Sequence, residues 1–483
     1  MSPPSCQALP TDTSTGNPRS GPAMRRLHGP EAASRILSRR RLVHGRRAPI
    51  PETSPGKRIE LNPAPTSVRA KPRTVFVMSC VLFGVHFAEA LSVNLLPLTL
   101  YLFTENAFFI GVILAINPVF GFIAQPIVGV LADRTWTRVG RRAFYFIIAA
   151  PIVAATEIAM PFATTLWVVV ALIIVMQFFV DVIFGAYHPL LAEMVPPSQR
   201  NFVAGVNLVG AQLGWIAVLF IGMPLVTWYR GTHGEELYGL PLYFMAAGVM
   251  LTFVMLAAFV LKEKRLDPVK PRARLTPRQY VRDFVDHPML LRLGFVNLLR
   301  SLQRTAIAGF VALYATKMLL FEEAEFGQSW GYMPFIALVF AMPVAFAMKR
   351  LNRQQAMILA FTVMLVCSAI GYVADTPSML LLAALCFGLA DVMAAMAHKT
   401  LCTDYFLQGM IGQQSTTMNI FYGVGRTVGL VLVGASINYV FDNDYSVIWP
   451  IAAVLAVIGI VALFGVRDVR HEERTRERAP ARA

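Results

Sequence analysis

The sequence predicts an all-α membrane protein in which twelve transmembrane helices form two six-helix bundles. Between residues 74 and 466 it holds twelve apolar stretches of about 20 residues each, the length that crosses the roughly 30 Å hydrocarbon core of a bilayer. The chain is 56% hydrophobic with a mean hydropathy of +0.56, which leaves too little polar surface to cover a soluble globule. The stretches are expected to be helices, because a helix satisfies its own backbone hydrogen bonds in lipid. One long polar segment at 262–289 divides them into two groups of six.

The expected helices follow one another with short polar connections, and each is justified by an apolar run of membrane-crossing length. In chain order they lie at 74–100, 109–131, 143–163, 166–187, 203–226, 240–261, 290–316, 329–348, 354–374, 377–398, 415–439 and 446–466. The seventh departs from the pattern because it carries Arg300 and Arg304. The third is separated from the fourth only near Met160-Pro161-Phe162.

The segments outside the helices are polar and mostly basic. Residues 1–73 are rich in Pro, Ser, Ala and Arg, which predicts a disordered basic tail, and residues 467–483 form a short charged tail. The Arg-rich, acid-poor composition of 1–73 also fits an organellar transit peptide, or a start codon placed too far upstream, with Met24 as one alternative. The loop at 262–289 joins the two bundles, 74–261 and 290–466.

Lysine and arginine are distributed unevenly between the two sets of loops. The loops after the second, sixth and eighth helices are strongly basic, whereas the opposite loops hold only Arg230 and Lys317 beside several acids. The positive-inside rule therefore predicts a multi-pass protein of the cell membrane with both termini and the 262–289 loop in the cytoplasm. The formal charge of +15 lies mainly in the first tail and these loops, where it sets topology and does not indicate a nucleic-acid partner.

The two bundles contain a repeated pattern. Asp181 is followed seven residues later by His188 in the fourth helix, and Asp391 is followed at the same spacing by His398 in the tenth. Such a repeat indicates duplication and a pseudo-twofold axis along the membrane normal, with the solute site near the midplane between the halves. The first, fourth, seventh and tenth helices occupy equivalent positions, so we expect them to line that site.

The strongest local motif bridges the second and third helices and reads GVLADRTWTRVGRR over residues 129–142. Its candidate gating residues are Gly129, Asp133, Arg134, Arg138, Gly140, Arg141 and Arg142. Gly129 lets two helices approach closely, and Asp133 can pair with a cation or face a helix N-terminus in the other half. A contact of this kind, broken as the halves rock, provides two discrete states. The alternative is that the arginines only anchor the loop.

The motif resembles the G-x-x-x-D-R-x-G-R-R signature of the major facilitator superfamily, in the longer version of the glycoside–pentoside–hexuronide and sucrose transporters. GFIAQPIVG at 121–129 is similar to the G-x-x-x-Q-P-x-x-G of the sucrose-type proteins. The resemblance is clearest over 80–215 and implies the major facilitator fold, sucrose:proton symport, and a role for Asp181 in proton coupling and sugar binding. The chain departs from that branch where Ile183-Phe184 stands in place of a polar Asn-Asn pair.

Ionisable side chains inside the expected helices are the remaining functional signal. Each costs at least about 2.5–3.5 kcal/mol at a helix centre, so it calls for a partner or a water-filled cavity. We expect solute binding and proton coupling to involve Asp181, Glu89, Arg300, Arg304, Asp391 and Gln303. Acids of the first half are expected to face arginines of the second half across the cavity. Structural ion pairs without coupling are the alternative, and Glu157 is expected to meet solvent at the outer edge.

These observations predict a secondary transporter, and not an enzyme, that moves a small polar solute such as a sugar or glycoside with protons. Neither a cofactor nor a metal is expected, because the five cysteines show no paired or metal-ligand spacing. The coupling ion is expected to be a proton, with sodium as the alternative. The expected partners are the solute and the lipid bilayer, and the chain is expected to be a monomer. Export of an amphipathic compound and a non-transporting role in assembling a membrane complex remain alternatives.

Overall fold

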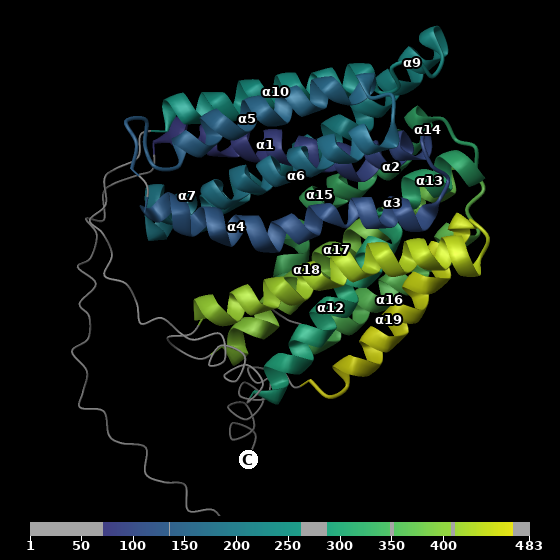
Figure 1. The fold of residues 1–483 in the computed structure, drawn as a ribbon. Coiled ribbons are helices and arrows are strands. Elements are labelled where there is room, and N and C mark those ends of the chain that lie inside the picture. The colour runs from purple at the N-terminus through teal and green to yellow at the C-terminus, as the bar shows by residue number, and fades with distance from the viewer. Residues whose placement is uncertain (1–70, 135, 262–286, 348–351, 407–410, 467–483) are drawn as a thin grey trace, which may run out of the picture. The chain divides into compact units, whose positions relative to one another are not determined.

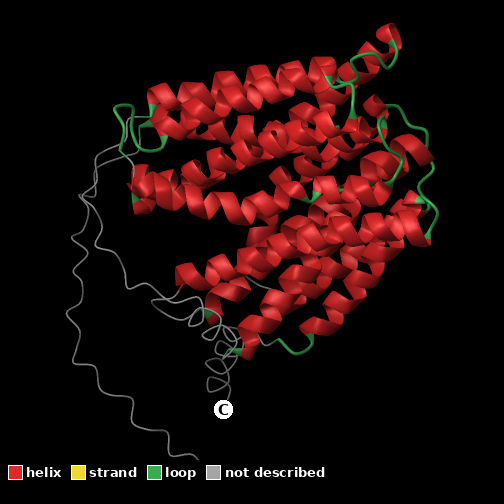
Figure 2. Ribbon diagram, in the orientation of Figure 1, coloured by secondary structure: helices red, strands yellow, loops and turns green. Residues whose placement is uncertain are grey.

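The described part of the chain is a bundle of membrane-crossing helices joined by loops (Figure 1, Figure 2). The computed structural model describes residues 71–134, 136–261, 287–347, 352–406 and 411–466. The tails and the central loop fall almost wholly outside these residues, so their predicted character stays a prediction. Eleven helical spans in the described residues are long and apolar enough to cross a membrane. The twelfth is α12 (Pro288–Ala308), which carries Arg292, Arg300 and Arg304.

The described residues of the first half form ten α-helices, besides short 3-10 and π-helical turns. They are α1 (Pro72–Asn94), α2 (Leu96–Tyr101), α3 (Ala107–Leu114), α4 (Ile116–Arg134), α5 (Ala143–Ala159), α6 (Leu166–Tyr187), α7 (Leu190–Met194), α8 (Arg200–Ala217), α9 (Met223–His233) and α10 (Leu240–Val260). Pro97, Pro118 and Pro224 lie at the junctions α1–α2, α3–α4 and α8–α9. Proline lacks a backbone N–H and clashes with the preceding turn, so these long helices are divided into two segments there.

The second half begins with α12. The segments that follow are α13 (Val311–Leu313), α14 (Glu323–Trp330), α15 (Tyr332–Ala347), α16 (Arg353–Tyr372), α17 (Pro377–Tyr405), α18 (Ile411–Ala435) and α19 (Ile448–Leu463). Several of these exceed their predicted windows: α12, α16 and α18 begin earlier than predicted, α14 starts before residue 329, and α17 continues past residue 398. Hydropathy marks the lipid-facing span, whereas backbone hydrogen bonds and caps continue a helix beyond it; Glu322 and Glu325 form such a capping box on α14.

The two halves repeat the same packing, as the sequence repeat predicts. In the first half, α1 packs against α8 and α10; in the second half, α12 packs against α18 and α19. Likewise α6 packs against α4 and α5, and α17 packs against α15 and α16. The correspondence places Asp181 of α6 and Asp391 of α17 at equivalent positions of the two halves.

The halves are joined at one end and separate toward the other. We call the end that holds Gly140 and Arg142 the motif end, and the end that holds Arg230 and Glu323 the far end. The largest buried apolar cluster lies toward the far end and contains side chains of both halves. Toward the motif end each half has its own apolar cluster, one among α1, α5, α6 and α10 and the other among α12, α16, α17 and α19. Figure 1 shows the ribbons diverging in the same direction.

Candidate functional site

A cavity of about 580 Å³ lies between the halves and reaches the motif end. Its lining runs from Glu89 and Asn117 in the interior to Gly129 and Pro189. Proline, phenylalanine and glycine alternate along it with carboxylates, amides and one guanidinium group, so its walls are amphipathic. A pocket with a few convergent polar groups in mostly apolar walls is the usual form of a small-molecule site.

The helices that line this cavity differ in part from those expected. The first and fourth predicted helices, now α1 and α6, do line it, and α12 lines a small adjoining pocket. The tenth, α17, contributes no residue to either lining within the described residues; α4 and α18 provide walls instead. The side chain of Asp391 on α17 is directed to the arginines of α12, which removes it from the cavity surface.

Glu89 faces an arginine of the other half, Arg426, and neither Arg300 nor Arg304. Its Oε1 lies 3.9 Å from Nη2 of Arg426 on α18, and its Oε2 lies 2.9 Å from Nδ1 of His86 one turn away. Arg426 therefore connects the acidic wall of the first half to the second half. The prediction of acids facing arginines across the cavity is met at this pair, with Arg426 in place of Arg300 or Arg304.

Asp181 is buried and lines the cavity, yet it has no cationic partner among the described residues. Its Oδ1 accepts a hydrogen bond of 2.7 Å from Nε2 of Gln125 on α4. Its expected pairing with Arg300 or Arg304 is therefore not found, because both arginines bind an acid of their own half. His188, just beyond the end of α6, also lines the cavity. The pKa of its imidazole is lowered, mainly because the ring is buried and to a smaller extent because His86 lies nearby. A carboxyl group bonded only to a neutral amide, beside a cavity, is free to take up a proton.

Arg300 and Arg304 of α12 share a single acid, Asp391 of α17. Nε of Arg304 lies 3.2 Å from Oδ2 of Asp391, and Nη1 of Arg300 lies 3.7 Å from its Oδ1. The Arg300 guanidinium also lies over the ring of Tyr422, 5.1 Å from its centroid. Two cations share one carboxylate, so this group of three side chains carries an excess of positive charge. Asp391 is thus a structural partner of both arginines and not an idle copy of Asp181.

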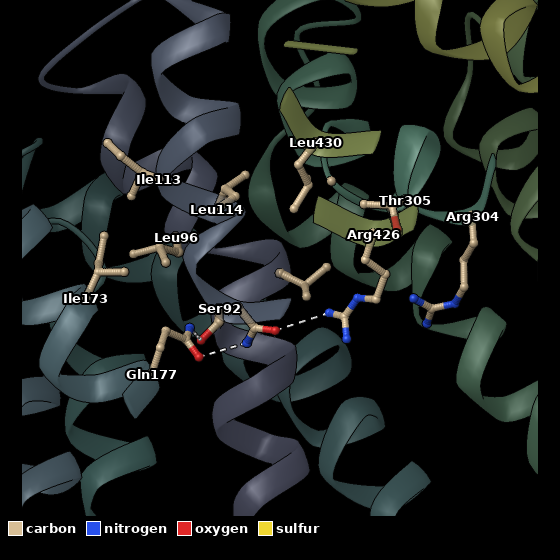
Figure 3. Close-up of a pocket in the computed structure, with 14 residues that line it drawn as sticks. Ser92, Leu96, Ile113, Leu114, Ile173, Gln177, Arg304, Thr305, Arg426 and Leu430 are labelled. Atoms are coloured by element: carbon tan, nitrogen blue, oxygen red, sulfur yellow. Dashed lines mark hydrogen bonds between the residues drawn. The ribbon is translucent and has the colours of Figure 1, made fainter. Parts of the chain in front are cut away.

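Four side chains form a hydrogen-bond chain across the two halves (Figure 3). Arg426 donates to Oδ1 of Asn117 (3.2 Å), and Asn117 donates to Oε1 of Gln177 (2.7 Å). Gln177 donates to Oγ of Ser92 (2.9 Å), whose hydroxyl donates to the Ala88 carbonyl (2.8 Å). Sequence reasoning overlooked Asn117, Gln177 and Ser92, although an amide inside an apolar window is itself a signal, since it needs a partner there.

Two expectations about polar residues in the helices were wrong. Gln303 does not face the cavity; its amide donates 2.9 Å to the carbonyl of Ala452, which packs α12 against α19. Glu157 does not meet solvent, since it is completely buried, and neither carboxyl oxygen has a hydrogen-bond partner among the described residues. Both side chains lie on helix faces turned away from the cavity lining.

At the motif end, two adjacent arginines bind one acid of the same half. Arg142 is completely buried, with Nη2 at 2.5 Å from Oε1 of Glu193 on α7 and Nη1 donating to the Ala186 carbonyl. Nη2 of Arg141 lies 2.7 Å from Oε2 of the same carboxylate. Gly140 adopts a φ of 122°, a region that favours glycine, and this turns the chain immediately before the two arginines.

The remaining residues of the motif make fewer contacts that bear on its role. Gly129 lines the cavity, and a Cβ there would lie 4.0 Å from the Gly185 carbonyl, so α4 and α6 run close together. Arg138 is exposed, and the side chains of Asp133 and Arg134 lie outside the described ones. The contacts of the two arginines with Glu193 support anchoring of the loop, and a gating role for the motif stays a prediction.

The far end is closed by a polar cluster that connects the halves, which we call the far-end cluster: Thr227, Arg230, Tyr238 and Glu323. Glu323 of α14 is 2% exposed and accepts from Nη1 of Arg230 (2.5 Å), the Tyr238 hydroxyl (3.1 Å) and the Thr227 hydroxyl (3.3 Å). Burial and the Glu323 carboxylate raise the pKa of the Tyr238 phenol well above its usual range, so it remains a donor.

Close backbone contacts accompany the far-end cluster. A Cβ on Gly434 of α18 would lie 2.5 Å from the carbonyl of Ala107 on α3, and one on Gly111 would lie 2.4 Å from the carbonyl of Leu430. Small residues allow helices to approach closely enough for such contacts. With the shared apolar cluster, they close the cavity on this side.

Comparison with known proteins agrees with this architecture. The family model described as Major Facilitator Superfamily matches residues 78–429 and 293–483. The Multidrug resistance protein MdtG of Salmonella heidelberg (strain SL476) is 25% identical over 340 residues, covering 69% of this chain and 79% of the relative. MdtG of Serratia proteamaculans (strain 568) is 28% identical over 264 residues, 52% of this chain and 59% of the relative, so that match spans less than two thirds of the relative.

Solved structures share the fold. The nucleoside transporter NupG superposes with a TM-score of 0.64 at 14% identity, over 81% of this chain and 99% of the other. The peptide transporter POT in complex with sulfate superposes with a TM-score of 0.61 at 14% identity, over 82% and 96%. Together with the family match, the two repeated halves and the central cavity of the described residues show that the chain belongs to the Major Facilitator Superfamily.

Proposed function

We propose that this transporter exports amphipathic compounds by alternating access coupled to protons. One observation carries the proposal: the amphipathic cavity between the halves includes Asp181, a buried carboxyl whose one hydrogen-bond partner in the described part of the chain is a neutral amide. Apolar and aromatic walls suit a compound with an apolar body, and the carboxyl group is able to bind a proton. Relatives with the name multidrug resistance protein support export over the sugar uptake implied by the motif resemblance.

The proposed cycle uses the contacts between the halves. In the state described here the cavity reaches the motif end, which the positive-inside rule assigns to the cytoplasm. A solute enters from there, and the halves then rock so that the motif end closes and the far end opens. The step requires that the far-end cluster and the bond between Arg426 and Asn117 break. When the far end is open, Asp181 binds a proton from the outside. The halves then rock back, and Asp181 releases the proton to the cytoplasm at the motif end.

A polar solute remains the second candidate. Asn117, Gln125 and Asn419 all line the cavity, and their amides are able to bind sugar hydroxyl groups. A role in assembling a membrane complex, without transport, is the third reading and predicts no flux at all.

Transport by the purified chain in proteoliposomes distinguishes these readings. With a pH gradient imposed, we would follow rhodamine 6G, 1-anilinonaphthalene-8-sulfonate and radiolabelled sucrose. Movement of either amphipathic dye against its gradient, abolished by a protonophore, is the expected result. Movement of sucrose alone would replace export with sugar transport. Flux of none of the three, combined with copurification of a membrane complex, would overturn the proposal.

A further inference from the structure

A small pocket at the interior end of the cavity is lined by two guanidinium groups and an unpartnered hydroxyl. Its volume is about 40 Å³, and its polar lining includes Arg304 and Thr305 of α12 and Arg426 of α18 (Figure 3). Asn117 and Arg426 line both this pocket and the main cavity, so the two spaces adjoin. We call it the inner pocket.

The inner pocket offers hydrogen-bond donors that the protein leaves unused. Arg304 binds Asp391 through Nε, and Arg426 binds Asn117 through Nη2; their other N–H groups bind no acceptor within the described part of the chain. Thr305 is 5% exposed, and its Oγ1 likewise has no hydrogen-bond partner among the described residues. A buried hydroxyl without a partner is costly, so its presence points to an acceptor that arrives from elsewhere.

The charges around the inner pocket favour a negatively charged acceptor. Arg304 and Arg426 line the inner pocket, and Asp391, the acid that pairs with Arg304, is shared with Arg300. Glu89 offsets Arg426 only in part, at 3.9 Å. Guanidinium groups bind oxyanions through paired N–H donors and more strongly than they bind neutral acceptors.

We propose that the inner pocket binds the carboxylate, or a similarly small oxyanion, of an amphipathic substrate, through Arg304, Thr305 and Arg426. This inference rests on the proposed export function and names its substrate class as amphipathic organic anions. A site for one water needs roughly 10–15 Å³ of such volume, so the pocket holds a head group but no apolar body. The body lies in the adjoining cavity, against side chains such as Phe122 and Phe184.

The placement separates the two ligands of the transporter. The anion binds α12 and α18 of the second half, whereas the proton binds Asp181 of the first half. Substrate and proton therefore do not compete for one side chain. A bound carboxylate also reduces the excess positive charge around the inner pocket, which the closing of the halves would otherwise bury.

Equilibrium dialysis of the full chain in detergent tests this with three radiolabelled ligands that share one apolar body. These are 1-naphthylacetate, its neutral amide 1-naphthylacetamide, and the cation 1-naphthylmethylammonium. The carboxylate should bind about tenfold more tightly than the amide, because the ionised acceptor strengthens each hydrogen bond. Thr305→Val, which keeps the shape but removes the hydroxyl, should weaken the carboxylate by about fivefold and the neutral amide less, while Thr305→Ser should retain carboxylate binding.

Arg426→Gln should weaken the carboxylate by about 30-fold and the amide much less, because a neutral carbonyl accepts weaker hydrogen bonds from a guanidinium group; the amide binding that remains reports that the variant is folded. Arg304→Lys keeps the charge and should have a smaller effect than Arg304→Gln. Equal affinity for the three ligands, or tighter binding of the cation, would overturn the anion site. Proton-driven flux of rhodamine 6G by the same protein would then leave the export function standing, so the two failures are distinguishable.

Discussion

Glu323→Gln should open the far end of the bundle. The carboxylate of Glu323 accepts three hydrogen bonds across the halves, from Arg230, Tyr238 and Thr227. Hydrogen bonds to a charged group contribute about 1.5–3 kcal/mol, and those between neutral groups about 0.5–1.5 kcal/mol. The variant keeps the shape of the side chain and loses the charge.

The magnitude follows from these three contacts. The Arg230 side chain is 37% exposed, so solvent screens its share and the lower end of the range applies. If each of the three contacts weakens by somewhat under 1 kcal/mol, the closed far end loses about 2 kcal/mol of stability relative to the open one. That corresponds to about a 30-fold fall in the ratio of closed to open molecules.

Double electron–electron resonance between spin labels measures this ratio. Glu236→Cys and Asp375→Cys place labels on exposed positions of the first and second half, in a background without native cysteines. The variant should add a population at longer distance. Asp442→Asn, which removes an exposed far-end acid outside the cluster, is the control and should leave the distances unchanged. Identical distance distributions for Glu323→Gln and the unmodified protein would refute the reasoning.

Three further predictions concern the proton, the helix contacts and the loop motif. Asp181→Asn should abolish accumulation driven by a pH gradient in proteoliposomes while solute binding persists, since an amide still bonds to Gln125 but cannot be ionised; unchanged accumulation would contradict this. Gly434→Ala should destabilise the closed far end by about 1–3 kcal/mol, seen as longer spin-label distances, because its Cβ would overlap a carbonyl. Gly248→Ala, where a Cβ meets nothing within 4 Å, is its control. Arg142→Ala should lower the free energy of unfolding by about 1–3 kcal/mol, since the partly buried Glu193 carboxylate keeps only Arg141 as an arginine partner, whereas the exposed Arg138→Ala should not; thermal unfolding in detergent measures the difference.

Much of the architecture could be predicted because it depends on local properties. A run of apolar residues of bilayer length identifies a helix whatever its neighbours are, and the repeat of Asp181 in Asp391 identified the two halves. The seventh helix was predicted despite Arg300 and Arg304, and α12 is there. Exact ends were less predictable, since caps such as that of Glu322 extend helices beyond their apolar windows.

The partners of the charged residues depend on how helices rotate and cross, which spacing alone does not set. Successive helix positions turn by about 100°, so Gln303 points to α19 while its neighbour Arg304 points to Asp391 and the inner pocket. Arg426 of α18 contacts Glu89 and Asn117 of the other half, and spacing along the chain does not reveal these contacts.

The sequence by itself determined that this is a twelve-helix membrane protein with a duplicated plan and charges inside its helices, because length, hydropathy and repetition are properties of the chain. Only the tertiary structure decided which charges meet, which face the cavity, and which end of the bundle is closed. Those outcomes arise from contacts between residues far apart in the chain, such as Arg230 with Glu323, whose energies exist only once the helices are packed.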